Sequence, residues 1–459
     1  MRDALHRKVA WSKLCLLVCV LGLAEPARAV VFTTNTLIGA GDTTYDGQDI
    51  TISGCTVTIN GAHTFGDVSV TSNGVVTHLF ATDTAEYRLE LACETLTVDS
   101  TSEIDVTARG YRPGRTYPNT VQGASPGSVG GSYGGRAFGS SNEVYGDFRN
   151  PNEVGSGGGG GWSGAGYFAG GGLVRVTAGR IVLEGKVIAD GGQSQAGSST
   201  GGGSGGGIRL EADTIQASGT ISAVGGMSLT GSGAYSGGGG RIAIIAHDEL
   251  SLDLSKVQAW GQTGVGAPGG AGTIYVRRPG QVDGELIVDN NGQVTTGWST
   301  PLTATGTGTL TLDGLSVLRQ ARVSTPDNIV VRGQYATSGQ AQLSAPRMTW
   351  SEGITVSASD GTVQLSAGPL TAGNLVLDND TLTVVAPMVV DSLTLSSSVL
   401  TVSSITLDSL TLSSSVLTVS SFIAVSKDVS LTAGSRLSHL AATDTAEYRL
   451  ELACETLTV

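Results

Sequence analysis

Carboxylates are the side chains of this sequence that could perform hydrolytic chemistry. Their densest group is Asp248, Glu249 and Asp253, in the run HDELSLD after an alternating apolar stretch. Hydrolysis of a glycosidic bond needs two carboxyl groups that face each other across that bond. Neighbouring acids in one short run are instead typical of a solvated corner between strands. We therefore expect these three to be surface residues, and we assign no catalytic residue.

One acidic loop is a candidate for metal binding. The sequence GDTTYDGQD, residues 41–49, brings Asp42, Asp46 and Asp49 into one loop, and calcium prefers such oxygen ligands. The spacing does not match an EF-hand loop, and Asp and Gly are equally typical of turns, so calcium stays an alternative to a plain turn. Zinc is not expected, because neither the histidines nor the cysteines have paired spacing. No other cofactor is expected.

Aromatic side chains gather in the glycine-rich part of the chain, although aromatic residues make up only 5% of the sequence. Tyr145, Trp162 and Tyr167 are the candidates for ligand contact. Tyr and Trp offer a large apolar area with a polar tip, which suits stacking on sugars or on a partner. A small apolar core beneath a long loop is the alternative interpretation, and the one we favour.

Two cysteines could form a disulfide in the first part of the chain. Cys55 and Cys93 both occupy apolar positions of alternating runs. A bridge between them is compatible with an oxidising compartment. A buried free thiol behaves as a small apolar side chain and fits the same positions, so both states remain open.

The N-terminus has the composition of a secretory signal peptide. Basic residues precede the apolar run 14–24, and Ala27-Arg28-Ala29 follows it, so we expect cleavage after Ala29. The apolar run has roughly half of the ~20 residues that a membrane span needs, so we expect no membrane span in the mature chain. A formal net charge of −13 argues against nucleic acid as a partner. We expect a secreted or cell-surface protein.

Apolar residues that recur every 34 positions predict stacked strands. Val174, Val176 and Ile181 match Ile208, Leu210 and Ile215, and the pattern returns near Ile242. Each unit is expected to be two short strands and a glycine-rich turn, and residues 89–98 fit the same template. A helix over residues 83–96 is an alternative, since Asp83 and Glu86 have capping-box spacing, but the alignment with the glycine-rich units favours strands. We expect the glycine runs to form ordered excursions on one side of the strands.

A tighter repeat and a long one complete the pattern. DSLTLSSSVLTVSS begins at Asp391 and again at Asp408, which would place Leu393 beside Leu410 and Leu400 beside Leu417. Such units bury their apolar faces only when they stack. ATDTAEYRLELACETLTV at residues 81–98 returns letter for letter at 442–459, so we expect a repeated module in a longer protein. The predicted fold is all-β, a right-handed parallel β-solenoid (β-helix) with glycine-rich excursions.

These patterns divide the chain into six predicted parts. They are a signal peptide at 1–29, N-terminal solenoid layers at 30–120, a glycine-rich aromatic excursion at 121–172, glycine-rich repeats of about 34 residues at 173–295, a Ser/Thr-rich solenoid with 17-residue repeats at 296–427, and the start of a second module copy at 428–459.

One stretch of the chain resembles a known class of proteins. The run VYGDFRNPNEVGSGGGGG, followed by GLVRVTAGRIVLEGKVIADGG and GGIRLEADTIQASGTISAVGG, is similar to large secreted bacterial surface proteins, described as adhesin-like, with glycine-rich parallel β-helix repeats. The resemblance covers roughly residues 132–261. It implies a structural or adhesive protein that contacts a surface polysaccharide or another extracellular component. A carbohydrate-active β-helix enzyme, a polysaccharide lyase or glycosidase, is the alternative.

Overall fold

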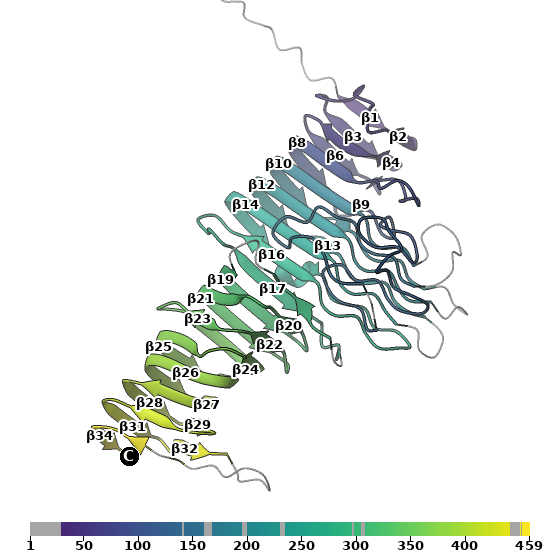
Figure 1. Cartoon of the computed structure of the whole chain (residues 1–459). Helices are drawn as coiled ribbons and strands as arrows, with labels where there is room; N and C mark the ends of the chain where they lie inside the picture. Colours follow the sequence, from purple (N-terminus) through teal and green to yellow (C-terminus); the bar gives the residue numbers. More distant parts are fainter. Residues whose placement is uncertain are drawn as a thin grey trace, which may run out of the picture.

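The chain is an all-β protein in which parallel strands stack around a common axis (Figure 1). The computed structural model describes residues 29–139, 142–159, 168–194, 200–229, 235–295, 298–303, 308–440, 450 and 452–459. Strands account for 49% of the structure and helix for 1%, the latter a 3-10 turn at Leu254–Lys256. The helical alternative for residues 83–96 is wrong, because β8, Leu89–Val98, is a strand. No helix within the described ranges is long and apolar enough to cross a membrane.

Short strands form the smaller of two sheets, and each pairs in parallel with the next. They are β2 (Thr36–Ile38), β4 (Thr56–Ile59), β7 (Val75–Thr77), β9 (Glu103–Asp105), β11 (Lys186–Ile188), β13 (Thr220–Ser222) and β15 (Val257–Gln258). Alternate residues point inward, so that Ile104, Val187, Ile221 and Val257 form one buried column. β-branched residues suit such a pleated, buried face.

Longer strands of the N-terminal half open the larger sheet. They are β1 (Val30–Phe32), β3 (Ile50–Ser53), β5 (Gly61–Thr64), β6 (Val68–Thr71), β8, β10 (Leu173–Leu183), β12 (Gly207–Ala217), β14 (Arg241–Leu252) and β16 (Thr273–Arg277). Leu89, Val174, Ile208 and Ile242 lie side by side in this sheet. The 34-residue alignment predicted from the sequence is therefore confirmed as strand register.

Strand direction reverses once, between the N-terminal and C-terminal stacks. β16 pairs antiparallel with β17 (Glu285–Asp289). The turn between them is held by Asp313, whose Oδ2 accepts the backbone N–H groups of residues 282, 283 and 284 at 2.8 to 3.0 Å. On β16, Ile274 packs into the N-terminal core and Tyr275 into the C-terminal core. The two stacks thus share the strands at the junction.

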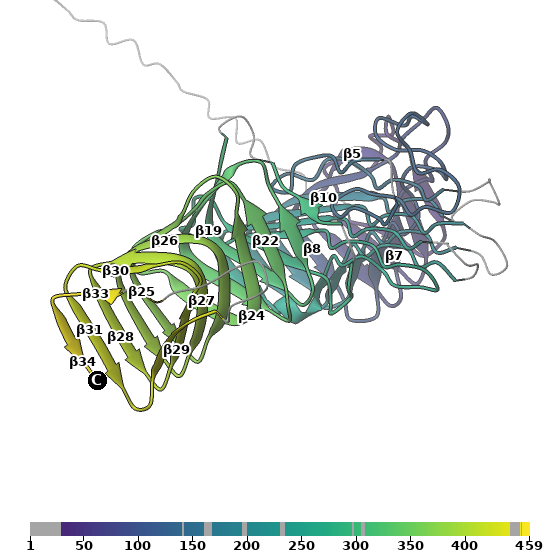
Figure 2. The ribbon, with the colours of Figure 1, turned by 60° about the horizontal axis from the view of Figure 1, so that its bottom comes forward.

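The C-terminal half continues the larger sheet. Its strands are β18 (Thr300–Pro301), β19 (Thr309–Leu318), β20 (Arg322–Ser324), β21 (Asn328–Ser338), β22 (Gln342–Ala345), β23 (Met348–Trp350), β24 (Thr355–Leu365), β25 (Leu370–Asp378), β26 (Thr381–Ser396), β27 (Val399–Leu407), β28 (Ser409–Ser413), β29 (Val416–Val419), β30 (Ile423–Val425), β31 (Asp428–Thr432), β32 (Arg436–His439), β33 (Leu452–Ala453) and β34 (Thr456–Thr458). Figure 2 shows these strands turning around their axis.

The short repeat and the long repeat both fold as the sequence predicts. Leu393 pairs with Leu410, and Leu400 pairs with Leu417. In the second copy, β31 and β32 occupy the positions of β6 and β7, and β33 and β34 fall within the counterpart of β8. A sequence that recurs therefore forms the same strands again, where the structure describes both copies.

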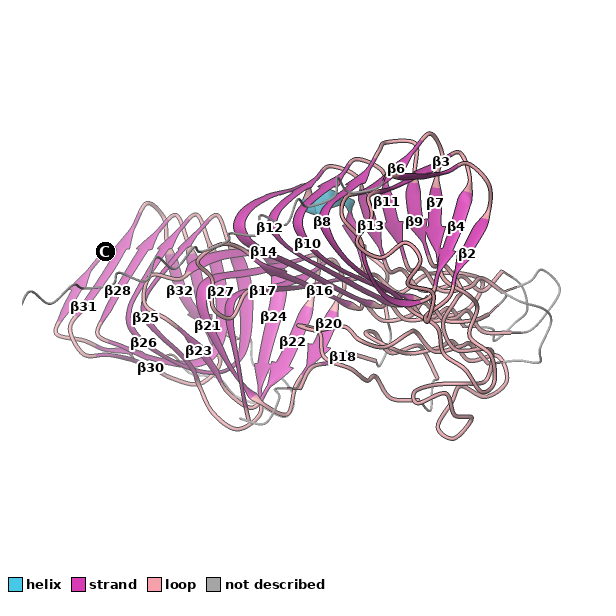
Figure 3. Ribbon diagram, turned by 90° about the horizontal axis from the view of Figure 1, so that it is seen from above, coloured by secondary structure: helices cyan, strands magenta, loops and turns pink. Residues whose placement is uncertain are grey.

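Glycine-rich segments between the strands lie side by side and bond through their backbones. Gly237 N donates to Gly226 O at 2.9 Å, Gly226 N to Gly203 O at 2.7 Å, and Gly203 N to Gly192 O at 3.0 Å. A Cβ on Gly226 would lie 2.0 Å from Gly192 O, so only glycine permits this spacing. We call residues 168–172, 189–194, 200–206, 223–228 and 235–240 the glycine slab. The predicted ordered excursions on one side of the strands are confirmed (Figure 3).

Candidate functional site

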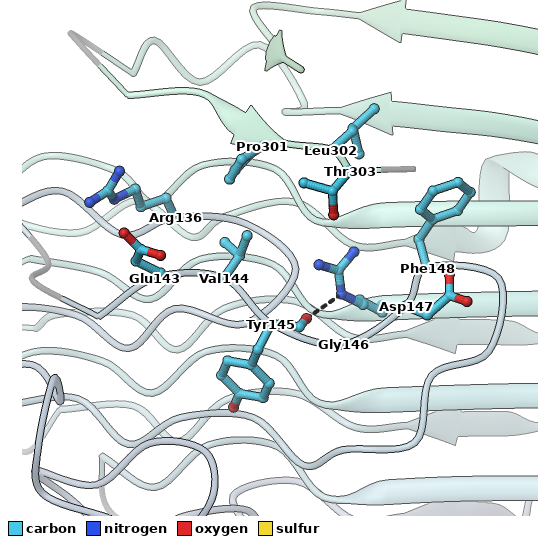
Figure 4. Close-up of a pocket in the computed structure, with 11 residues that line it drawn as sticks. Arg136, Glu143, Val144, Tyr145, Gly146, Asp147, Phe148, Pro301, Leu302 and Thr303 are labelled. Carbon is cyan, nitrogen blue, oxygen red and sulfur yellow. Dashed lines mark hydrogen bonds between the residues drawn. The ribbon is translucent and has the colours of Figure 1, made fainter. Parts of the chain in front are cut away.

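A cavity of about 390 Å³ opens where the glycine-rich excursion meets the first C-terminal layers (Figure 4). It is lined by Arg136, Arg241, residues 143–148 and residues 301–303, and we call it the arginine cavity. Arg241 is the first residue of β14, and residues 300–301 form β18. The site therefore rests on strands of both stacks, with the excursion closing one side.

Arg241 is a buried cation without a carboxylate partner. Its side chain is part of a residue only 3% exposed. Nε donates to the backbone oxygen of Tyr145 at 2.9 Å, and Nη1 donates to Thr273 Oγ1 at 3.3 Å. Burial lowers the pKa of the guanidinium, while Tyr133 and the carboxylate of Glu153 act in the opposite direction. An arginine stays protonated in proteins, so the cavity has a fixed positive charge with N–H groups left to donate.

Arg136 brings a second guanidinium to the same cavity. It stacks over the ring of Trp298, 4.6 Å from the ring centroid, and its Nε is buried without a hydrogen-bond partner. The backbone holds it in place, because Arg136 O accepts the N–H of Gly270 at 2.8 Å. Within the described residues, neither Arg136 nor Arg241 forms an ion pair.

Two carboxylates also line the arginine cavity. Figure 4 shows Glu143 near Arg136, and Asp147 near Phe148 at the other end. Asp147 Oδ1 accepts the backbone N–H of Arg149 at 2.9 Å, which fixes the turn after it. Each carboxylate can accept hydrogen bonds from hydroxyl groups of a ligand.

A second hollow of about 270 Å³ lies on β20, β22 and β24 and is lined by polar side chains. Ser324, Ser344 and Gln364 occupy equivalent positions on these three strands. Trp298 lines this hollow as well as stacking with Arg136. We call it the polar hollow. Trp298 thus connects the two recesses.

Tyr145 belongs to a packed aromatic cluster. Its ring lies 4.8 Å from that of Tyr133 and 5.3 Å from that of Tyr117. Its hydroxyl donates to Val154 O at 2.7 Å, and burial raises its pKa. In Figure 4 the ring points away from Pro301, so Tyr145 lines the arginine cavity through its backbone. The other two aromatic candidates, Trp162 and Tyr167, lie outside the described residues.

The two predicted disulfide partners are free thiols in the structure. Val75 N donates to Cys55 O, whereas the segment of Cys93 pairs with the neighbourhood of Phe65. The strand register therefore places the two cysteines at different points of their layers. Cys55 Sγ donates to the backbone oxygen of Phe32 at 3.3 Å instead, and burial raises the pKa of Cys93 to about 12.

The acidic loop and the acidic run have separate local roles. Asp42 accepts Thr44 N, Asp46 contacts the ring of His63 at 3.1 Å, and Asp49 accepts Asp67 N at 2.9 Å. Asp253 caps the 3-10 turn. No group of three or more metal-ligating side chains occurs in the described ranges.

The sequence interpretation missed Arg136 and Arg241. Both directly follow glycine runs, GG before Arg136 and GGGG before Arg241. A long cation at the end of a glycine run is the one local signal for them. Compared with protein-family models, with curated proteins and with solved structures, the chain matches none, so its function is inferred from its own residues.

Proposed function

We propose that the chain is a secreted or cell-surface, non-catalytic structural and adhesive protein, built as a right-handed parallel β-solenoid with glycine-rich excursions. Continuous columns such as Leu393, Leu410, Val429 and Leu457 support the solenoid. Stacking of this kind gives a rigid, elongated scaffold, because every layer buries its apolar face against the next. The signal-peptide composition of residues 1–29 supports export.

We propose that the contact surface for a glycan is the arginine cavity together with the polar hollow. The observation that favours this assignment is a recess with fixed donors and acceptors on rigid strands, connected through Trp298 to a second recess. Recesses of about 300–1,000 Å³ are typical of ligand sites. A chain-like ligand could contact both recesses at once, and aromatic and polar side chains suit a polysaccharide.

A carbohydrate-active enzyme is the second candidate, since Glu143 and Asp147 line one cavity. Glycoside hydrolysis uses two carboxyl groups on opposite sides of the bond. We place it second because Asp147 already accepts a backbone N–H, and the buried cations Arg136 and Arg241 suit binding.

The test is a polysaccharide panel assayed for both retention and release of reducing ends. The chain from residue 30 onward would be used, with the variant Thr303→Trp, which fills the cavity from an exposed position, and Thr355→Trp as the matched control on an exposed strand position elsewhere. We expect retention of at least one polysaccharide, weakened by Thr303→Trp alone. No retention across the panel would refute the adhesive function. Reducing ends that increase with time and disappear in Glu143→Gln would establish the enzyme instead.

A further inference from the structure

The arginine cavity contains more positive charge than its partners neutralise. Arg241 is 3% exposed, and the two side-chain hydrogen bonds that it makes both go to uncharged oxygens, Tyr145 O and Thr273 Oγ1. Burying a guanidinium without a counterion is unfavourable. A ligand that brings a carboxylate would supply that counterion.

The geometry of a guanidinium selects the kind of anion. Its planar N–H groups match the two oxygens of a carboxylate in a bidentate arrangement. Arg136, whose Nε is buried without a partner, lines the same cavity. Two unpaired guanidinium groups in one recess therefore point to a carboxylate bound between them.

The rest of the recess limits the size and charge of the ligand. A volume of about 390 Å³ is far larger than a single inorganic anion needs. Glu143 and Asp147 would repel a densely charged polyanion, and the net charge of −13 acts in the same direction. The same carboxylates accept hydrogen bonds from hydroxyl groups. One carboxylate surrounded by hydroxyl groups satisfies all of these constraints.

We propose that the arginine cavity binds the carboxylate of an acidic sugar, a uronic acid within a polysaccharide, with Arg241 and Arg136 as its cationic contacts. This inference rests on the proposed glycan-binding function and adds the class of sugar. Arg241 also ties the excursion to β14 through Tyr145 O, so ligand binding and the position of residues 143–148 are coupled through one side chain.

The test is calorimetric titration of the chain from residue 30 onward with short oligomers of uronic acids. The neutral oligomers of the same sugars and sodium sulfate are titrated in parallel. We expect the acidic oligomers to bind at least roughly tenfold more tightly than the neutral ones, because one charge-assisted pair is worth about that much. Sulfate is expected to bind weakly, and the affinity for the acidic oligomers is expected to fall with salt.

Three variants assign the contact. Arg136→Gln removes a guanidinium that makes no side-chain hydrogen bond to a described residue, so the fold should be unchanged and the affinity should fall roughly tenfold or more. Arg241→Lys keeps the charge without the planar fork and should also weaken binding. Arg180→Gln is the control, since Arg180 is exposed and contacts only Gln216. If Arg241→Lys does not fold, as judged by circular dichroism, Arg136→Gln decides the matter.

The outcomes separate this inference from the function beneath it. Neutral and acidic oligomers that bind equally would overturn the uronic-acid assignment and leave glycan binding intact. Sulfate that binds as tightly as the oligomers would show a general anion site and would also overturn it. Acidic oligomers bound equally well by Arg136→Gln and by the unaltered chain would place the contact elsewhere. Failure of every glycan to bind would refute both proposals.

Discussion

His78 should make the stability of the N-terminal stack depend on pH. The residue is fully buried. Its Nδ1 lies 2.8 Å from Leu79 O, and its Nε2 lies 3.2 Å from the backbone nitrogen of Leu173. Because a backbone N–H can only donate, Nε2 must be the acceptor and Nδ1 must hold the proton. The ring is therefore neutral in the folded protein, and burial lowers its pKa to about 3.

The direction and size of the effect follow from proton linkage. The unfolded chain, with a histidine pKa near 6.5, binds a proton before the folded chain does as the pH falls. The stabilisation is thus complete above pH 6.5 and is lost progressively toward pH 3, at about 1.4 kcal/mol per pH unit. Between pH 7.5 and pH 5.0 the contribution of His78 to the free energy of unfolding should fall by about 2 kcal/mol.

The repeated sequence supplies a matched control. His439 is the copy of His78, and its Nδ1 makes the same contact with Leu440 O, at 2.6 Å, but its side chain is exposed. Urea unfolding at pH 7.5 and pH 5.0 would compare the unaltered chain with His78→Gln and with His439→Gln. Burial also raises the pKa of Asp190 to about 6, which stabilises the fold as the pH falls, and this effect cancels between variants.

His78→Gln should cost roughly 1–3 kcal/mol at pH 7.5, because the N–H of Leu173 loses a good acceptor. It should also remove the 2 kcal/mol loss on going to pH 5.0, whereas His439→Gln should retain it. If His78→Gln and the unaltered chain show the same change between the two pH values, the buried neutral histidine is not the cause and the reasoning is refuted.

Three further predictions concern the slab, the junction and the thiols. Gly226→Ala should lower the free energy of unfolding by at least ~1–3 kcal/mol, since its Cβ would overlap backbone, whereas Gly41→Ala, with nothing within 4 Å, should change it by under about 0.5 kcal/mol in thermal melts. Asp313→Ala should cost roughly 1–3 kcal/mol and increase proteolysis in residues 278–284, because three N–H groups lose their acceptor. Cys55 and Cys93 should both react with a thiol reagent after unfolding without reductant; loss of either signal would indicate a bridge.

The strand register could be predicted from the sequence because parallel stacking converts sequence spacing directly into contact. Val174 and Ile208 are 34 residues apart and pair side by side, so one periodic pattern specifies both the strand and its neighbour. The 17-residue spacing of Leu393 and Leu410 works in the same way. Only the local alternation and the period are needed.

The arginine cavity could not be predicted in that way. Arg241 meets Tyr145 across 96 positions of sequence, and no period connects the excursion to the strand on which it folds back. The reversal at β16 and β17 was also missed, although the turn residues Pro279, Gly280 and Gly284 interrupt the apolar pattern there. Apolar residues on both faces of β14, in RIAIIA, were the remaining signal that a second core lies behind it.

The direction of the hydrogen bonds determines how the molecule would respond to tension. Each strand bonds to the strand of the next layer, so the bonds of the C-terminal stack run along its length. A force that pulls the two ends apart would open one layer at a time, as in peeling, and release its contour length in steps. In the N-terminal half, the glycine slab adds backbone bonds between the same successive layers, so each step there must break two sets of bonds together. The protein would therefore behave as a compliant spring joined to a stiff grip.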